Sequence, residues 1–160
     1  PSLAILREVG GSLRMQISSR LTMAVHTLLC IAYFEKTEKV TSSFIASSVG
    51  TNPVIIRNLL TQLKAAEFID VKRGAGGATL KKPLENISLY DVYHAVDCIP
   101  SDSLFHFHEH PSPQCPVGKT IHLSLDDKLS QVQQAMEEQM RRISLADMAG
   151  TMEKAIDQQC

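Results

Sequence analysis

Apolar residues recur at helical spacing along the first half of the chain and predict three helices. The first covers residues 21–33. The second is a short helix through Phe44, Ile45 and Val49, which Thr41 or Ser42 can cap and Gly50 closes. The third begins at Pro53, because Asn52 can cap a helix and proline suits its first position. Its apolar residues share one face: Ile56, Leu59, Leu60 and Leu63. The last two helices are therefore expected to meet across a tight glycine turn.

The pattern changes from helical to alternating after the third helix. Residues 68–73 alternate as in a strand, residues 74–77 are glycine-rich, and residues 78–80 resume the strand pattern. This predicts a β-hairpin. A helix at 88–96 follows, then a proline-containing loop, and a long helical pattern over 125–148. The expected fold class is mainly α with a small β-hairpin, a winged helix-turn-helix plus a long C-terminal dimerisation helix.

These elements divide the chain into four segments. Residues 1–14 lack clear periodicity and precede Met15, so we interpret them as a leader added to the natural sequence. Residues 15–97 form the expected DNA-binding domain, 98–123 a sensor or linker loop, and 124–160 the dimerisation helix and tail. The apolar seam of the long helix has no evident partner in so short a chain, which predicts a homodimer unless the seam packs on the first helix.

Composition favours a soluble protein of the reducing cytoplasm. No apolar run approaches the roughly 18 residues of a membrane span, and the four cysteines show no disulfide spacing. The net charge is −1, yet residues 15–82 carry +5 and residues 83–160 carry −7. A basic N-terminal part suits a polyanion, although a solvated surface gives the same excess. No nucleophile–base pair, catalytic carboxylate pair or phosphate loop stands out, so an enzyme is not expected.

The polar face of the third helix carries the first set of candidate DNA contacts, because the helix after such a turn enters the major groove. Arg57 can bond guanine bidentately, and Asn58 can address adenine or a phosphate. Two aliphatic residues can touch thymine methyls, unless they belong to the core. The remaining candidates on this helix and at its start are Thr51, Asn52, Val54, Ile55 and Thr61.

The hairpin carries the second set. Basic residues flank its glycines on both sides, at 72–73 and at 81–82. Arg73 is the expected minor-groove probe. The glycines let the backbone approach a phosphate closely, although an ordinary hairpin turn would also use them. The candidates here are Gly74, Gly76 and Gly77.

Four segments in unbroken order carry a family resemblance: MQISSRLTMAVHTLLCIA, IASSVGTNPVIIRNLLTQLKAAEFI, VKRGAGGATL and ISLYDVYHAVD. The RGxGG hairpin followed by an I-x-L-x-D-V helix is specific. With these segments the chain closely resembles the IscR-like (Rrf-type) winged-helix transcription regulators. The resemblance implies a homodimeric repressor with crossed C-terminal helices, a base contact at Arg57 and a minor-groove contact at Arg73. It also implies that Ser18 and Arg20 lie near the backbone phosphates.

Many of these regulators hold an iron–sulfur cluster on three closely spaced cysteines before the long helix. Here that loop contains only Cys98 and Cys115, and only Cys115 matches a ligand of the pattern. Such clusters generally need four ligands, mainly thiolates, so one or two cysteines are insufficient unless histidines substitute. We therefore predict a cluster-free relative without a cofactor.

Histidines in the same loop leave a metal-responsive regulator open as an alternative. His106, His108 and His110 precede Cys115, and His122 lies beyond it. Imidazole and thiolate suit zinc, but the spacing matches no standard finger, so no metal ligand is assigned.

Cys115 is the candidate redox sensor. Pro116 would place its thiol at the start of a short helix through His122, with Lys119 one turn on, and both features favour thiolate. The expected function is a sequence-specific DNA-binding repressor responsive to a redox or other small signal. A winged helix that binds proteins instead of DNA is the other alternative.

Overall fold

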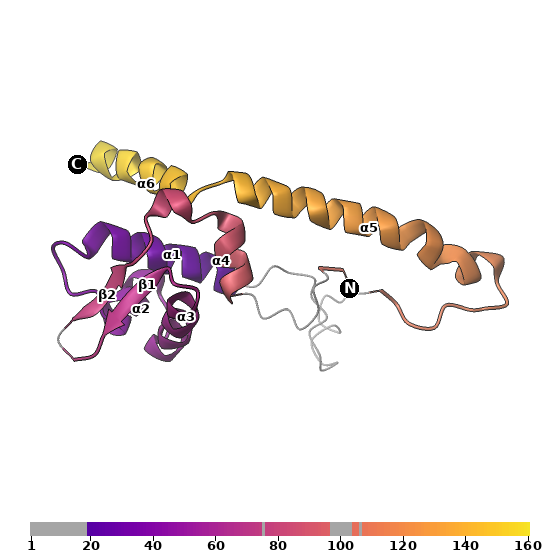
Figure 1. Ribbon diagram of the computed structural model, residues 1–160, viewed down its shortest axis with the longest axis horizontal. Helices are drawn as coiled ribbons and strands as arrows, with labels where there is room; N and C mark the ends of the chain where they lie inside the picture. Colours follow the sequence, from indigo (N-terminus) through magenta and orange to yellow (C-terminus); the bar gives the residue numbers. More distant parts are fainter. Residues whose placement is uncertain (1–18, 75, 97–103, 106) are drawn as a thin grey trace, which may run out of the picture.

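The computed structural model describes residues 19–74, 76–96, 104–105 and 107–160. The expected leader at 1–14, together with Ser18, Cys98 and His106, lies outside these residues. The elements follow in this order (Figure 1): α1 (Ser19–Phe34), α2 (Ser42–Val49), α3 (Pro53–Ala65), β1 (Ile69–Lys72), β2 (Gly77–Leu80), η2 (Leu84–Asn86), α4 (Leu89–Val96), α5 (Pro116–Arg142) and α6 (Leu145–Gln159). The predicted class, mainly helical with one β-hairpin, is confirmed.

Side-chain caps fix the turn between α2 and α3. The hydroxyl of Thr41 accepts a hydrogen bond from the Phe44 backbone N–H at 3.1 Å and starts α2. Gly50 ends it in the left-handed region, with φ 77°. Asn52 Oδ1 then accepts from the Val54 N–H at 2.8 Å and starts α3 at Pro53. The predicted glycine turn between two helices is therefore formed as the sequence indicates.

The hairpin docks against the segment between α1 and α2. Strands β1 and β2 pair antiparallel. The Ala78 N–H donates to the Val40 carbonyl at 2.8 Å, and the Leu80 N–H donates to the Glu35 carboxylate at 2.7 Å. Gly77 permits this approach, because a Cβ there would lie 2.9 Å from the Val40 nitrogen. The β1–β2 hairpin, which is the wing of the winged helix, is thus held at a fixed place beside α3.

One core joins α1, α2, α3, the hairpin and α4. The predicted apolar face of α3 is buried in it, and α1 supplies Leu28 and Ile31 with no exposed surface. Thr27 is also fully buried, and its hydroxyl donates to the Met23 carbonyl at 2.8 Å. Helices α1 to α4 and the hairpin are called the N-terminal module below. An extended link between α5 and α6 joins it through two backbone hydrogen bonds, from Leu89 N–H to Ile143 O and from Leu145 N–H to Ile87 O.

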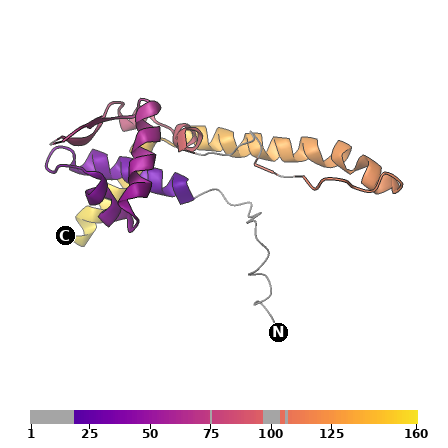
Figure 2. The same cartoon turned by 90° about the horizontal axis from the view of Figure 1, so that it is seen from below.

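The C-terminal helices differ from the expected single helix over 125–148. Helix α5 begins at Pro116, as predicted for the short helix after Cys115, but it continues past His122 to Arg142. The predicted loop 98–123 is therefore helical from residue 116 on. Residues 143–144 are extended because they bond to the module, and a reciprocal capping box between Ser144 and Asp147 starts α6. Helix α5 extends away from the module, and α6 lies alongside it (Figures 1 and 2).

Candidate nucleic-acid interface

The outward face of α3 presents the side chains that the sequence singled out. Val54 and Ile55 are 53% and 36% exposed, so the alternative that they belong to the core is wrong. Arg57, Asn58 and Thr61 are exposed on the same helix. Because the opposite face is buried, α3 offers one mixed apolar and polar surface to a partner.

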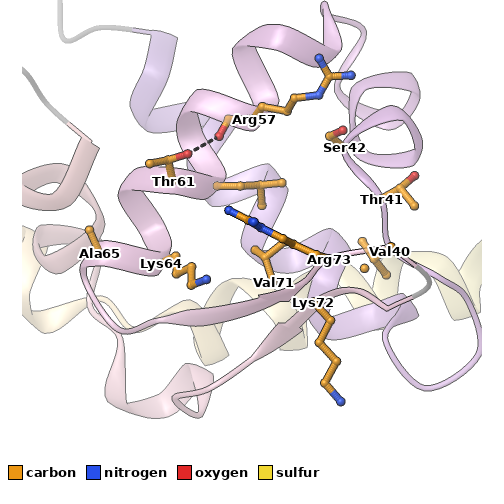
Figure 3. A pocket seen from close by; sticks show the side chains of 13 residues that line it. Val40, Thr41, Ser42, Arg57, Thr61, Lys64, Ala65, Val71, Lys72 and Arg73 are labelled. Carbon is orange, nitrogen blue, oxygen red and sulfur yellow. Dashed lines mark hydrogen bonds between the residues drawn. The ribbon is translucent and has the colours of Figure 1, made fainter.

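A groove of about 720 Å³ separates this helix from the wing. Arg57 and Lys64 line it from α3, and Lys72 and Arg73 line it from the hairpin. Figure 3 shows the Arg73 side chain reaching toward α3, while Arg57 and Lys72 extend outward in different directions. Both walls of the groove therefore carry basic side chains.

The groove is cationic without internal neutralisation. No Asp or Glu is found among the described residues that line it. Lys81 differs, because its ammonium is paired with the Glu67 carboxylate, and this hydrogen-bonded pair raises the pKa of Lys81 and lowers the pKa of Glu67. The ammonium of Lys82 lies 5.8 Å from the centre of the Phe68 ring. The positive potential of the groove therefore comes from the four residues on its walls.

The wing glycines have different roles. Gly74 has φ 77° with open space around it, and Gly76 is also exposed. A Cβ at Gly76 would lie 2.2 Å from the Lys72 Cβ, which explains the absence of a side chain there. Gly77 is buried against Val40, so its role is to dock the hairpin. Only the first two glycines leave backbone open to a partner.

Arg20 is used inside the module. Its Nε donates to the Val96 carbonyl at 3.3 Å, and its terminal nitrogen donates to the Gln62 side-chain oxygen. The guanidinium thereby fastens the start of α1 to α3 and α4. The expected phosphate contact at Arg20 has to compete with these bonds, so we leave Arg20 out of the surface proposed below.

Lys64 is a groove residue that the sequence reasoning missed. It lies three residues after Thr61 and seven after Arg57, which places the three on one helical face. Extending the helical period of the polar face to the end of α3 would have found it.

Cys115 and the nearby histidines stand at the far end of α5. Cys115 is exposed and precedes the first turn of α5, but its side chain makes no capping hydrogen bond. His122 Nδ1 lies 3.0 Å from Asp126 Oδ1, and the His108 ring lies 5.5 Å from the His122 ring. Within the described part of the chain, no group of three or more His, Cys, Asp or Glu is placed to hold a metal ion.

Comparisons with known proteins agree with this architecture. A family model described as "Iron-dependent Transcriptional regulator", named Rrf2, matches residues 17–151. The chain belongs to the Rrf2 family. It is 45% identical over 132 residues to YwnA of Bacillus subtilis (strain 168), named as a candidate HTH-type transcriptional regulator, covering 82% of this chain and 96% of YwnA. YwgB of the same organism, named likewise, is 34% identical over 84 residues, covering 52% of this chain and 54% of YwgB.

Solved structures give the same result. A crystal structure of a candidate DNA-binding protein is 38% identical with a TM-score of 0.62, covering 81% of this chain and 98% of that one. The IscR of T. potens is 22% identical with a TM-score of 0.63, covering 91% of this chain and 93% of that one. It shares the fold. This Rrf2 protein is thus a DNA-binding transcription regulator with a winged-helix fold, and it is not an enzyme.

An iron–sulfur cluster does not fit the thiolates that this chain offers. The segment before α5 contributes only Cys98 and Cys115, whereas iron–sulfur clusters generally take four ligands, mainly thiolates. Cys115 is an exposed thiol at the start of a helix. A cluster-free regulator therefore stays our prediction. Among the described residues, no helix has the length and apolar character to cross a bilayer.

Proposed function

We propose that this Rrf2 regulator is a homodimeric repressor that reads its operator with α3 and the wing of each protomer. The cationic groove between these two elements carries the proposal, because basic residues on both walls match the phosphates that border a DNA groove. The exposed face of α3 favours DNA over a protein partner, which would require an apolar or acidic face instead.

The exposed residues divide into base-reading and positioning groups. Arg57 addresses guanine, Asn58 addresses adenine or a phosphate, and Val54 and Ile55 meet thymine methyls in the major groove. Arg73 enters the adjacent minor groove from the wing. Backbone and polar groups hold the register on phosphates: Thr51, Asn52, Thr61, Lys64, Gly74 and Gly76.

The long helix supports the dimer. Met140 is the one residue of α5 that is buried within the chain. Val132 is 54% exposed on the apolar seam of α5, so this stripe does not pack wholly on α1. A second copy of α5 would cover such a stripe.

A salt titration of DNA binding tests the function. Electrophoretic shifts with operator DNA, selected from random sequence by the protein itself, should show affinity that falls steeply with ionic strength, because phosphate contacts release counterions. Lys154→Ala, which removes an exposed charge on α6, serves as the control and should keep the wild-type slope. Absence of any selected sequence would favour the protein-binding alternative.

Cys115 is our candidate for a redox input. Its exposed thiol directly precedes the first turn of the 27-residue α5, where an oxidant can reach it. Oxidant treatment should weaken operator binding of the wild type while leaving Cys115→Ser unaffected. If the serine variant releases DNA equally, the signal does not enter at Cys115.

A further inference from the structure

A second cavity, of about 380 Å³, lies between α1, α2 and α6 and shares no lining residue with the cationic groove. Helix α1 supplies Leu29, Tyr33 and Phe34, and α6 supplies Met152 and Ile156. Cavities of this size with mainly apolar walls and a few polar groups are typical of small-molecule sites.

The side chains of His26, Ser48 and Cys30 form the polar edge of this cavity. The Nε2 atom of His26 lies 2.9 Å from the Ser48 hydroxyl, and Cys30 lines the same cavity beside them. His26 and Ser48 are exposed, whereas Cys30 is 5% exposed, and burial raises the pKa of its thiol. The cavity thus has an accessible polar edge and a buried, uncharged thiol behind it.

The side chains that line the cavity determine which class of ligand it can bind. The described residues around the cavity include no Lys, Arg, Asp or Glu, so a charged ligand would lose hydration without gaining a partner. Aromatic walls and the Met152 sulfur favour an aromatic ring. We propose that the cavity binds a small neutral phenol, with its ring between α1 and α6 and its hydroxyl on the Ser48–His26 pair.

The position of Ser48 links this site to α3. Ser48 lies on α2, two residues before the Gly50 turn into α3, while the wing is held separately at Val40. A ligand hydroxyl that takes the place of the Ser48–His26 bond separates α2 from α1 and shifts α3 relative to the wing. The phenol is therefore an effector that weakens operator binding, a role that rests on the proposed DNA-binding function.

Binding is tested first on the full chain without DNA, with phenol itself as the probe. Calorimetric titration should show saturable binding, and phenol should slow alkylation of Cys30 by N-ethylmaleimide, mapped by peptide mass spectrometry, without slowing that of Cys115. Ser48→Ala should weaken phenol binding about five-fold, the worth of one hydrogen bond. Ser47→Ala, an exposed neighbour on the same helix, should leave it unchanged.

A cavity-filling variant tests the location. Ile156→Phe should abolish phenol binding, whereas Ala155→Phe adds the same ring at an exposed neighbouring position and should keep it. No saturable binding to the wild type, or equal protection of Cys30 and Cys115, overturns the site. The site is also overturned if alkylation of Cys30 becomes faster on dilution and does not change with phenol. That result would mean that a second copy of the chain covers the cavity.

The effector role is measured last. Phenol should reduce operator affinity of the wild type and of Ala155→Phe, but not of Ile156→Phe. Phenol that binds in the cavity and leaves operator affinity unchanged overturns this role. A protein that binds phenol but no DNA refutes the proposed function and leaves the site standing, so the two failures are distinguishable.

Discussion

At the residue scale, Arg57 and Lys64 share one face of α3 but serve different expected contacts. Arg57→Ala should cost about 1–3 kcal/mol of binding to the operator and little on random DNA, because a bidentate guanine contact is lost. Lys64→Ala should weaken both DNAs alike and reduce the salt slope by about one, since it neutralises a phosphate. Fluorescence anisotropy at several salt concentrations makes the comparison. Equal losses on both DNAs for Arg57→Ala would show that it meets only phosphate.

Gly77 is the residue on which the place of the wing depends. Gly77→Ala should lower the free energy of unfolding by about 1–2 kcal/mol for its left-handed backbone and by roughly 1–3 kcal/mol more for the clash with Val40. Gly74→Ala is the matched control, because it has the same backbone region with open space and bears only the first cost. Urea unfolding measures both. Equal stability of the two variants would contradict the docking role.

At the element scale, the N-terminal module could be predicted from the sequence because each boundary has a local chemical cause. Thr41, Gly50 and Asn52 cap their helices through their own side chains or backbone. The break between α5 and α6 was missed because its cause is partly non-local: residues 143–144 are extended through bonds to Ile87 and Leu89. The groove was missed for the same reason, since the wing meets α3 only through tertiary packing. A local signal existed, however, in the Ser144-x-x-Asp147 capping box.

That capping box gives a prediction for α6. Ser144→Ala should destabilise the protein by about 1 kcal/mol, because the Asp147 N–H loses its acceptor at 3.2 Å. Hydrogen exchange should increase in the first turn of α6 and leave α3 protected. Ser130→Ala, exposed in the middle of α5, removes a hydroxyl without a capping role and should have little effect. Unchanged hydrogen exchange in α6 would mean that the hydrogen bonds between residues 143–145 and the start of α4 fix the first turn of α6 without the Ser144 cap.

At the scale of the whole molecule, two distant surfaces have to act together. A single α3 and wing cover one half-site, and helix-turn-helix dimers reach two half-sites about one helical turn apart. The distance between the two α3 helices in a dimer is then set by how two α5 helices cross. In the proposed dimer, the seam of α5 would therefore fix the spacing at which the two cationic grooves meet the DNA.

The dimer can be tested at Val132, which is 54% exposed on the apolar seam of α5. Val132→Glu places a charge where a second copy should pack, so sedimentation at micromolar concentration should change from dimer to monomer. Ser124→Glu adds the same charge at another exposed position of α5, off the seam, and should stay dimeric. The Val132→Glu monomer should keep its fold and its salt-dependent binding to random DNA, yet lose most operator affinity, because one half-site alone supplies half of the contacts. A wild type that sediments as a monomer would contradict the dimer outright, and a monomeric variant with full operator affinity would separate recognition from dimerisation.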